Sequence, residues 1–136
     1  MKHLAKVFVV DDDPAILSSI EALLTAQGYS VRCFATAEEF IAQHHPTQVG
    51  CVLIDLWMPG IGGSELLRRL RESRSLLSVI IISGMIDSAV LDESEKASVP
   101  ILAKPYDEQT FLKLVEEGIA DSVQRRADQL RGWQHY

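Results

Sequence analysis

Six polar side chains that could share one chemical site follow short apolar runs in this sequence. They are three consecutive aspartates, a fourth aspartate, a serine and a lysine: Asp11, Asp12, Asp13, Asp55, Ser83 and Lys104. Clustered carboxylates repel one another, and a hard divalent cation with oxygen ligands, most simply Mg²⁺, would offset that repulsion. With such a cation bound, a carboxylate can attack a phosphoryl group. The residue types therefore indicate a magnesium-dependent site for phosphoryl transfer.

Each of these side chains except Asp13 has an expected part in that chemistry. Asp12 and Asp55 would bind the cation directly, and Asp11 would orient a water molecule bound to it. Asp55 would be the nucleophile, so that the product is an acyl phosphate on this residue. Lys104 would neutralise charge on the phosphoryl oxygens, and the Ser83 hydroxyl would donate a hydrogen bond to one of them. Neither the GxGxxG motif nor the GxxxxGK motif of phosphate-binding loops is present.

The hydrophobic pattern predicts the elements that carry these residues. Short apolar runs typical of strands alternate with segments that have the 3.6-residue period of helices. Asp13 is expected to cap the first helix, whose first turn accommodates Pro14 and whose end is marked by Gly28. This alternation predicts a doubly wound α/β fold with a parallel sheet, because parallel strands need crossover connections. The predicted strands are 6–10, 30–34, 49–54, 78–82 and 101–103, and the predicted helices are 14–28, 37–44, 64–73, 88–97 and a long one from 107.

The candidate site residues all fall at one edge of such a sheet. In parallel doubly wound sheets, ligands bind beyond the carboxyl ends of the strands, at the switch point of the strand order. Residues 11–13 follow the first predicted strand, Asp55 the third, Ser83 the fourth and Lys104 the fifth. The sequence therefore predicts that these side chains converge on one rim.

Composition and charge argue against several classes of protein. The 136 residues suggest one domain, and 47% hydrophobic and 24% charged residues are ordinary values for a globular protein. The formal charge of −6 argues against direct nucleic-acid binding by this chain, because such binding needs a basic surface. Apolar runs do not exceed four residues, too few to cross a membrane, and residues 1–6 show no secretory signal. We therefore expect a cytoplasmic protein without a membrane partner.

Four motifs in this order resemble the receiver domains of two-component response regulators. They are VVDDDP at 9–14, CVLIDLWMPGIGG at 51–63, IIISG at 80–84 and AKPY at 103–106, and the resemblance covers residues 4–120. It implies a flavodoxin-like (βα)5 fold with strand order 2-1-3-4-5. It also implies phosphotransfer from a histidine kinase to Asp55 with Mg²⁺, rather than a conventional enzyme activity.

The same resemblance assigns roles to the other matching residues. It implies that Asp11 and Asp12 are the acidic pair, that Ser83 is the switch hydroxyl and that Lys104 is the lysine followed by a proline. It also implies that the backbone carbonyl of Trp57 is the third protein ligand of the metal. The segment 50–63 looks like the FixJ-type branch, whose outputs are LuxR-type helix-turn-helix domains, so the resemblance implies control of transcription.

The sequence departs from the receiver pattern near the expected output face. Ile101 occupies the switch position, where receivers commonly carry an aromatic residue, and the predicted helix 88–97 has little apolar periodicity. We expect that Asp55 accepts a phosphoryl group but that transmission of the signal differs from aromatic-gated receivers. Receivers often form dimers through this helix, the strand after it and the last helix. The resemblance is compatible with a homodimer of this kind, and the sequence leaves the oligomeric state open.

The C-terminal residues 121–136 exceed what the last receiver helix needs. Apolar residues at Ile119, Val123, Ala127 and Leu130 have the 3–4 spacing of a helix that continues. This segment resembles a linker toward a DNA-binding output domain that the present chain does not contain. A receiver without an output domain, with a helical tail for dimerisation or partner docking, is the alternative.

Two other functions are compatible with parts of the sequence. A small phosphatase of the haloacid-dehalogenase type would use Asp11 as its nucleophile, because residues 11–13 satisfy a DxD motif. The chain is short for that family, however. The second alternative is a pseudo-receiver that binds a partner without phosphorylation, as Ile101 and the unusual helix 88–97 would allow. Phosphorylation of Asp55, of Asp11 or of neither distinguishes the three readings.

Overall fold

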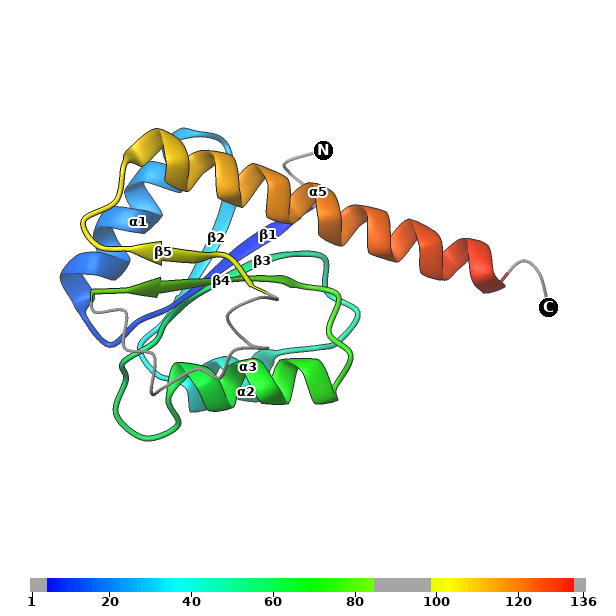
Figure 1. The fold of residues 1–136 in the computed structure, drawn as a ribbon, viewed down its shortest axis with the longest axis horizontal. Helices are drawn as coiled ribbons and strands as arrows, with labels where there is room; N and C mark the ends of the chain where they lie inside the picture. The colour runs from blue at the N-terminus through cyan, green and yellow to red at the C-terminus, as the bar shows by residue number, and fades with distance from the viewer. Residues whose placement is uncertain (1–4, 85–98, 134–136) are drawn as a thin grey trace.

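The alternating apolar runs form a parallel sheet with helices on both of its faces (Figure 1). The computed structural model describes residues 5–84 and 99–133. Within them, the five strands lie in the order β2-β1-β3-β4-β5, which confirms the predicted flavodoxin-like order 2-1-3-4-5. The strands are β1 (Lys6–Val10), β2 (Ser30–Phe34), β3 (Gly50–Asp55), β4 (Ser78–Ser83) and β5 (Ile101–Ala103).

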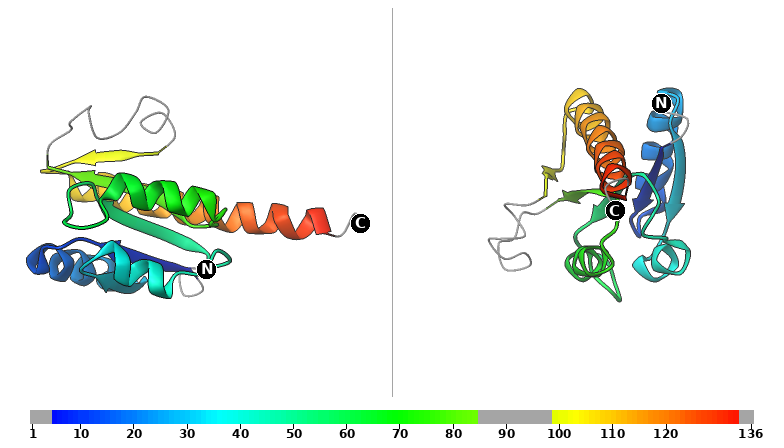
Figure 2. Two further views of the ribbon diagram at one scale, coloured as in Figure 1. Left: turned by 90° about the horizontal axis from the view of Figure 1, so that it is seen from below. Right: turned by 90° about the vertical axis from the view of Figure 1, so that its right-hand side faces the viewer.

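Among residues 5–84 and 99–133, two pairs of helices cover the sheet, one pair on each face (Figure 2). The helices α1 (Pro14–Ala26) and α5 (Glu108–Trp133) pack on one face through buried residues that include Leu24 and Phe111. The helices α2 (Ala37–Gln43) and α3 (Gly63–Glu72) pack on the other face through Phe40, Leu66 and Leu67. The predicted helix 88–97 lies outside the described residues. Because both faces of the sheet are covered, all six residues of β3 are buried.

The boundaries at the rim differ from the predictions in an informative way. Asp55 is the last residue of β3 and is paired in register with Ile82, although the predicted strand stopped one residue earlier. Ser83 is likewise the last residue of β4 and is paired with Ala103. The last residue of each of these two strands is therefore polar and still belongs to the sheet. The pairing with the neighbouring strand fixes the position of its backbone. At the start of α1, Asp13 is the N-cap as predicted, and its side chain accepts a hydrogen bond from Ala15 N–H at 2.9 Å.

The last helix is continuous over 26 residues and projects beyond the sheet (Figures 1 and 2). Its first half is anchored by Phe111, Val115 and Ile119 in the core, whereas Leu130 is 54% exposed. The predicted helical continuation is therefore present as far as Trp133. Among the described residues, no helix combines the length and the apolar character needed to cross a membrane.

A buried serine, Ser122, fixes α5 to the end of the sheet where β3 begins, opposite the carboxyl ends of the strands. The Ser122 Oγ accepts a hydrogen bond from Gly50 N–H at 3.0 Å and donates one to the Leu76 carbonyl at 2.6 Å. Arg125 donates to the same carbonyl at 2.9 Å and to the Ser78 Oγ at 2.9 Å. The side chain of Ser122 thus satisfies a buried backbone donor at the start of β3.

The variant Ser122→Ala is expected to lower the free energy of unfolding by about 1–3 kcal/mol, because it leaves the buried Gly50 N–H without this acceptor. Urea unfolding followed by circular dichroism measures the difference. Ser19→Ala, at an exposed position of α1, is the matched control and is expected to change little. An equal effect of the two substitutions would contradict the role given to Ser122.

Candidate functional site

Three carboxylates meet at the carboxyl ends of β1 and β3. The two strands are adjacent in the sheet, and Val10 is paired in register with Ile54. Asp11, which follows Val10, therefore lies beside Asp55, which follows Ile54. One carboxylate oxygen from each of Asp11, Asp12 and Asp55 lies within 4.8 Å of the others. Asp11 and Asp55 are only 4% and 9% exposed, whereas Asp12 is open to solvent. The predicted convergence of these residues is therefore present in the structure.

Asp11 is held in place from three directions. Its Oδ1 accepts a hydrogen bond from Asp13 N–H at 2.9 Å, and its own N–H donates to the Phe34 carbonyl at 3.1 Å. The Lys104 Nζ lies 3.8 Å from its Oδ2. Burial raises the pKa of Asp11, and the Asp13 N–H and the Lys104 ammonium oppose that increase. Asp11 is thus an oriented carboxylate with a destabilised negative charge.

Asp55 carries the larger destabilisation. Burial raises the pKa of Asp55 to about 6, and the nearby Asp11 carboxylate adds to the increase. The Lys104 ammonium and the Trp57 N–H, which lies 3.4 Å from Asp55 Oδ1, lower it. Three carboxylates with one ammonium group leave an excess of negative charge that a cation would relieve. The donors are all oxygens, so the site fits a hard divalent cation such as Mg²⁺.

Lys104 and Ser83 lie at the ends of the next two strands. The Lys104 N–H donates to the Ser83 carbonyl at 2.8 Å, and the bond between Lys104 and Pro105 is cis. The side chain of Lys104 reaches across to Asp11, so the predicted amine belongs to the carboxylate cluster. Ser83 is fully buried at the end of β4, the strand next to β3.

The remaining predicted residues lie around this cluster. Trp57 is the second residue of the loop after β3 and is 48% exposed. Ile101 begins β5, pairs with Ile81 and is half-buried against the cluster of apolar side chains under α2 and α3. Ile101 is therefore on the strand that Lys104 directly follows, three residues before it.

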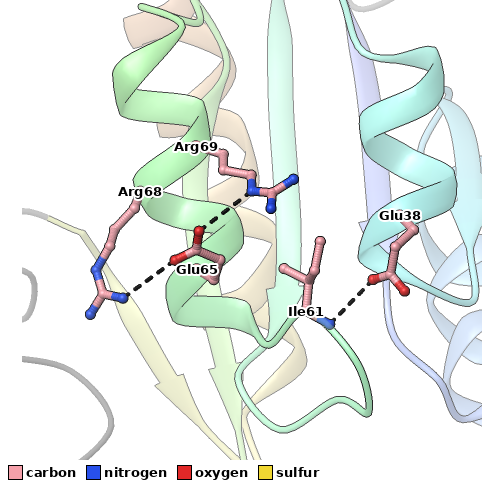
Figure 3. Close-up of polar contacts among 5 residues, drawn as sticks. All are labelled: Glu38, Ile61, Glu65, Arg68 and Arg69. Carbon is pink, nitrogen blue, oxygen red and sulfur yellow. Dashed lines mark hydrogen bonds and ion pairs between the residues drawn. The ribbon is translucent and has the colours of Figure 1, made fainter.

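Two residues near the site were missed by the reasoning from sequence. Tyr106 stacks on Phe111 with ring centroids 5.2 Å apart, and burial and then the Asp11 charge raise its pKa. Glu38, on α2, accepts a hydrogen bond from Ile61 N–H in the loop after β3, at 3.3 Å (Figure 3). Tyr106 belongs to the AKPY motif, so the sequence could have indicated its place near Lys104. No pattern in the sequence singles out Glu38.

The close approach of Gly63 to the Asp55 backbone was also not predicted from the sequence. Gly63, the first residue of α3, has no side chain, and a Cβ at this position would lie 2.7 Å from the Asp55 carbonyl oxygen. The motif GIGG offered three glycines at 60, 62 and 63, but composition alone does not say which one is required. Figure 3 also draws exposed ion pairs on α3, from Glu65 to Arg68 and Arg69, which lie outside the carboxylate cluster.

Comparison with known proteins shows a consistent set of relatives. The family model of the response regulator receiver domain matches residues 7–116. The response regulator protein TodT of Pseudomonas putida is 29% identical over 123 residues, which are 90% of this chain and 54% of TodT. The transcriptional regulatory protein FixJ of Bradyrhizobium diazoefficiens is 32% identical over 114 residues, 83% of this chain and 56% of FixJ. The chain thus spans a little over half the length of these curated relatives.

Solved structures give the same likeness in three dimensions. The response regulator StyR superposes with a TM-score of 0.88 at 31% identity, covering 96% of this chain and 66% of that one. The structure described as FixJ-N superposes with a TM-score of 0.75 at 30% identity, covering 85% of this chain and 94% of that one.

Proposed function

The chain belongs to the response regulator receiver domain family, and from this we propose that Asp55 is its phosphoryl acceptor in two-component signal transduction. The observation that supports the proposal is the cluster of Asp11, Asp12 and Asp55 carboxylates beside the Lys104 ammonium. Asp55 is the only one of the three that combines a position at the end of the central strand with low exposure and a pKa of about 6. At neutral pH its carboxylate is mostly ionised and therefore nucleophilic.

The proposed transfer is a single displacement at phosphorus. An oxygen of the Asp55 carboxylate attacks the phosphoryl group and the new O–P bond forms. The P–N bond to the histidine of the kinase breaks with its electron pair going to the histidine nitrogen, which takes up a proton from solvent water. The Lys104 ammonium holds the phosphoryl oxygens, and the Ser83 hydroxyl donates to one of them in the acyl phosphate.

Asp12, Asp55 and the backbone carbonyl of Trp57 would hold a Mg²⁺ ion, with Asp11 bound to it through water. Such an ion supplies positive charge for the incoming phosphoryl oxygens and offsets the repulsion among the carboxylates. The excess negative charge at the rim and its all-oxygen donor set support this assignment.

The phosphoryl group would then change the surface formed by β5 and α5. It adds about −1.5 to −2 charge at the rim, enough to reorder a nearby hydroxyl. Ile101 is the proposed switch position on β5, in place of the usual aromatic residue. We propose that this surface controls dimerisation or an output domain in a longer cytoplasmic regulator of transcription, since the FixJ relatives are named transcriptional regulatory proteins. The continuous helix after residue 120 would be the linker to that output.

Incubation of the wild-type chain with acetyl phosphate and Mg²⁺ tests this function. The expected result is a mass gain of one phosphoryl group that maps to the peptide containing Asp55 and disappears when EDTA removes the cation. A phosphorylated Asp11 would instead support the phosphatase alternative. Absence of any mass gain, with acetyl phosphate and with a phosphorylated histidine kinase, would favour the pseudo-receiver that binds its partner without phosphorylation.

A further inference from the structure

We propose that Glu38 is a positioning residue for phosphoryl acceptance, because it holds the loop of residues 56–62 that carries the Trp57 carbonyl. The inference rests on the proposed function, since the loop matters to the reaction only if that carbonyl binds the cation. Glu38 lies 23 residues before its hydrogen-bond partner and on a different helix from the one that follows the loop.

The contact joins α2 to the middle of the loop. Glu38 is the second residue of α2, and its Oε1 accepts the hydrogen bond from Ile61 N–H at 3.3 Å. Figure 3 shows the Glu38 side chain reaching from α2 to the loop between β3 and α3. Thr36 caps this helix through its own side chain, which accepts from Glu39 N–H, so Glu38 is not needed as the cap.

The second Glu38 carboxylate oxygen lies against Gly60. Gly60 has a φ of +76°, a conformation that favours glycine, and a Cβ added there would lie 2.9 Å from Glu38 Oε2. The carboxylate therefore occupies the space that the missing side chain leaves open. Both oxygens of Glu38 thus face consecutive parts of the same loop, at Gly60 and at Ile61.

Two further hydrogen bonds lie at the ends of this loop rather than in its middle. Trp57 N–H donates to Asp55 Oδ1 at 3.4 Å, and Gly63 N–H donates to the Leu56 carbonyl at 3.2 Å. The N-cap of α3 is Gly62, which offers no side-chain hydrogen bond. The Glu38 contact therefore restrains a segment that local capping does not.

Loss of this restraint should affect cation binding more than the chemical step. Asp55 is fixed by the β3 ladder and Asp11 by its own hydrogen bonds, so neither depends on Glu38. The Trp57 carbonyl, in contrast, is part of the loop whose middle Glu38 holds. The expected signature is a higher Mg²⁺ requirement with an unchanged rate at saturating Mg²⁺.

Three variants of the full chain test the inference: Glu38→Ala, Glu38→Gln and Glu39→Ala. For each, the Mg²⁺ concentration that gives half the maximal rate of phosphorylation by acetyl phosphate is measured, together with the urea unfolding midpoint. Glu38→Ala is expected to raise that concentration about threefold to tenfold, as loss of the net contribution of one hydrogen bond implies. Glu38→Gln removes the same charge but keeps an acceptor oxygen, and it should stay near the wild type. Glu39→Ala removes the neighbouring carboxylate, which accepts a hydrogen bond from Ala35 N–H instead of from the loop. This variant should also need the same Mg²⁺ concentration as the wild type.

Hydrogen exchange of the peptide that contains Ile61 supplies a readout independent of phosphorylation. Faster exchange in Glu38→Ala than in Glu38→Gln supports the contact, whether or not the wild type accepts a phosphoryl group. Failure of the wild type to accept a phosphoryl group would overturn the proposed function but not the contact. The inference is overturned if exchange at Ile61 is unchanged in Glu38→Ala. It is also overturned if a phosphorylated wild type and Glu38→Ala need the same Mg²⁺ concentration, or if the Ala and Gln variants behave alike.

Discussion

Substitution of Asp55 by asparagine is expected to abolish phosphoryl uptake and, in the absence of metal, to stabilise the fold. The amide has nearly the same shape as the carboxylate but is not a nucleophile, so no acyl phosphate can form. It also removes one of three negative charges whose oxygens lie within 4.8 Å of one another. Intact-mass measurement after incubation with acetyl phosphate and Mg²⁺ checks the first effect, and urea unfolding in EDTA checks the second.

The stabilisation should depend on pH because burial raises the pKa of Asp55 from 3.8 to about 6. A folded state with the higher pKa binds the proton more tightly than the unfolded chain does. The stability that this group contributes is therefore fully present below the unfolded pKa of 3.8 and is lost as the pH rises through about 6. Above that pH, the ionised Asp55 costs about 2–3 kcal/mol, and the Asn variant avoids this cost. The two unfolding free energies should accordingly diverge between about pH 4 and pH 7.

Asp121→Asn provides a matched control, since Asp121 is exposed on α5 and lies outside the carboxylate cluster. This variant should accept a phosphoryl group normally and should show no such pH-dependent gain in stability. Addition of Mg²⁺ should stabilise the wild type more than Asp55→Asn, because the cation loses a ligand in the variant. A mass gain that persists in Asp55→Asn would place the acceptor elsewhere, and Asp11 would be the first candidate.

Much of this architecture follows from patterns that the sequence displays locally. The run 6–10 contains apolar residues in succession, as expected for a strand with both faces covered, and β1 has these same bounds. Asp13 and Pro14 are a local capping signal, and α1 begins there. Once the strands are known to be parallel, the aspartates after β1 and at the end of β3 must share a rim. The convergence of Asp11 with Asp55 was therefore predictable without any knowledge of tertiary contacts.

Other features of the site depend on contacts between segments that are distant in the sequence. Asp11 and Asp12 are adjacent and chemically identical, yet one is buried beneath Lys104 and the other faces solvent. The buried position of Asp11 comes with contacts to Asp13 N–H and to the Lys104 ammonium, and Lys104 lies far away in the sequence. The hydrogen bond from Ile61 N–H to Glu38 likewise depends on how α2 lies beside the loop after β3. The sequence of neither segment indicates that the two are in contact. Hydrophobic periodicity reports which face of an element is buried, but it does not report which loop a polar side chain will meet.

Gly63 links the packing of α3 to the chemistry proposed for Asp55, and Gly63→Ala is expected to impair both. A Cβ at this residue would lie 2.7 Å from the Asp55 carbonyl oxygen, 2.9 Å from Leu56 Cα and 3.2 Å from Ile54 Cγ2. Two of these atoms are backbone atoms, at the end of β3 and directly after it, so they cannot move aside without displacing Asp55, the proposed phosphoryl acceptor. Overpacking of this kind costs about 1–3 kcal/mol, and we expect it to lower the urea unfolding midpoint.

The neighbouring variant Gly62→Ala distinguishes a steric effect from a general sensitivity of this turn. Gly62 has an extended conformation that alanine adopts, with φ of −77° and ψ of 173°, and the nearest atom to its added Cβ is the Leu56 carbonyl oxygen at 3.9 Å. Its substitution should cost less than about 1 kcal/mol, the difference between Gly and Ala at an N-cap. Equal stability of the two variants would contradict the close approach of α3 to β3.

The rate of phosphorylation separates displacement of Asp55 from simple loss of stability in Gly63→Ala. A domain with an unfolding free energy of about 5–15 kcal/mol remains almost entirely folded after a loss of about 2 kcal/mol. A lower rate at saturating Mg²⁺ and acetyl phosphate would therefore arise in the folded protein, from a carboxylate moved relative to Asp11 and Lys104. Because in-line attack tolerates only small errors in position, we expect the rate to fall about tenfold or more in Gly63→Ala and to stay near the wild type in Gly62→Ala. A normal rate in Gly63→Ala, despite lower stability, would show that α3 supports the sheet without setting the position of Asp55, the proposed phosphoryl acceptor.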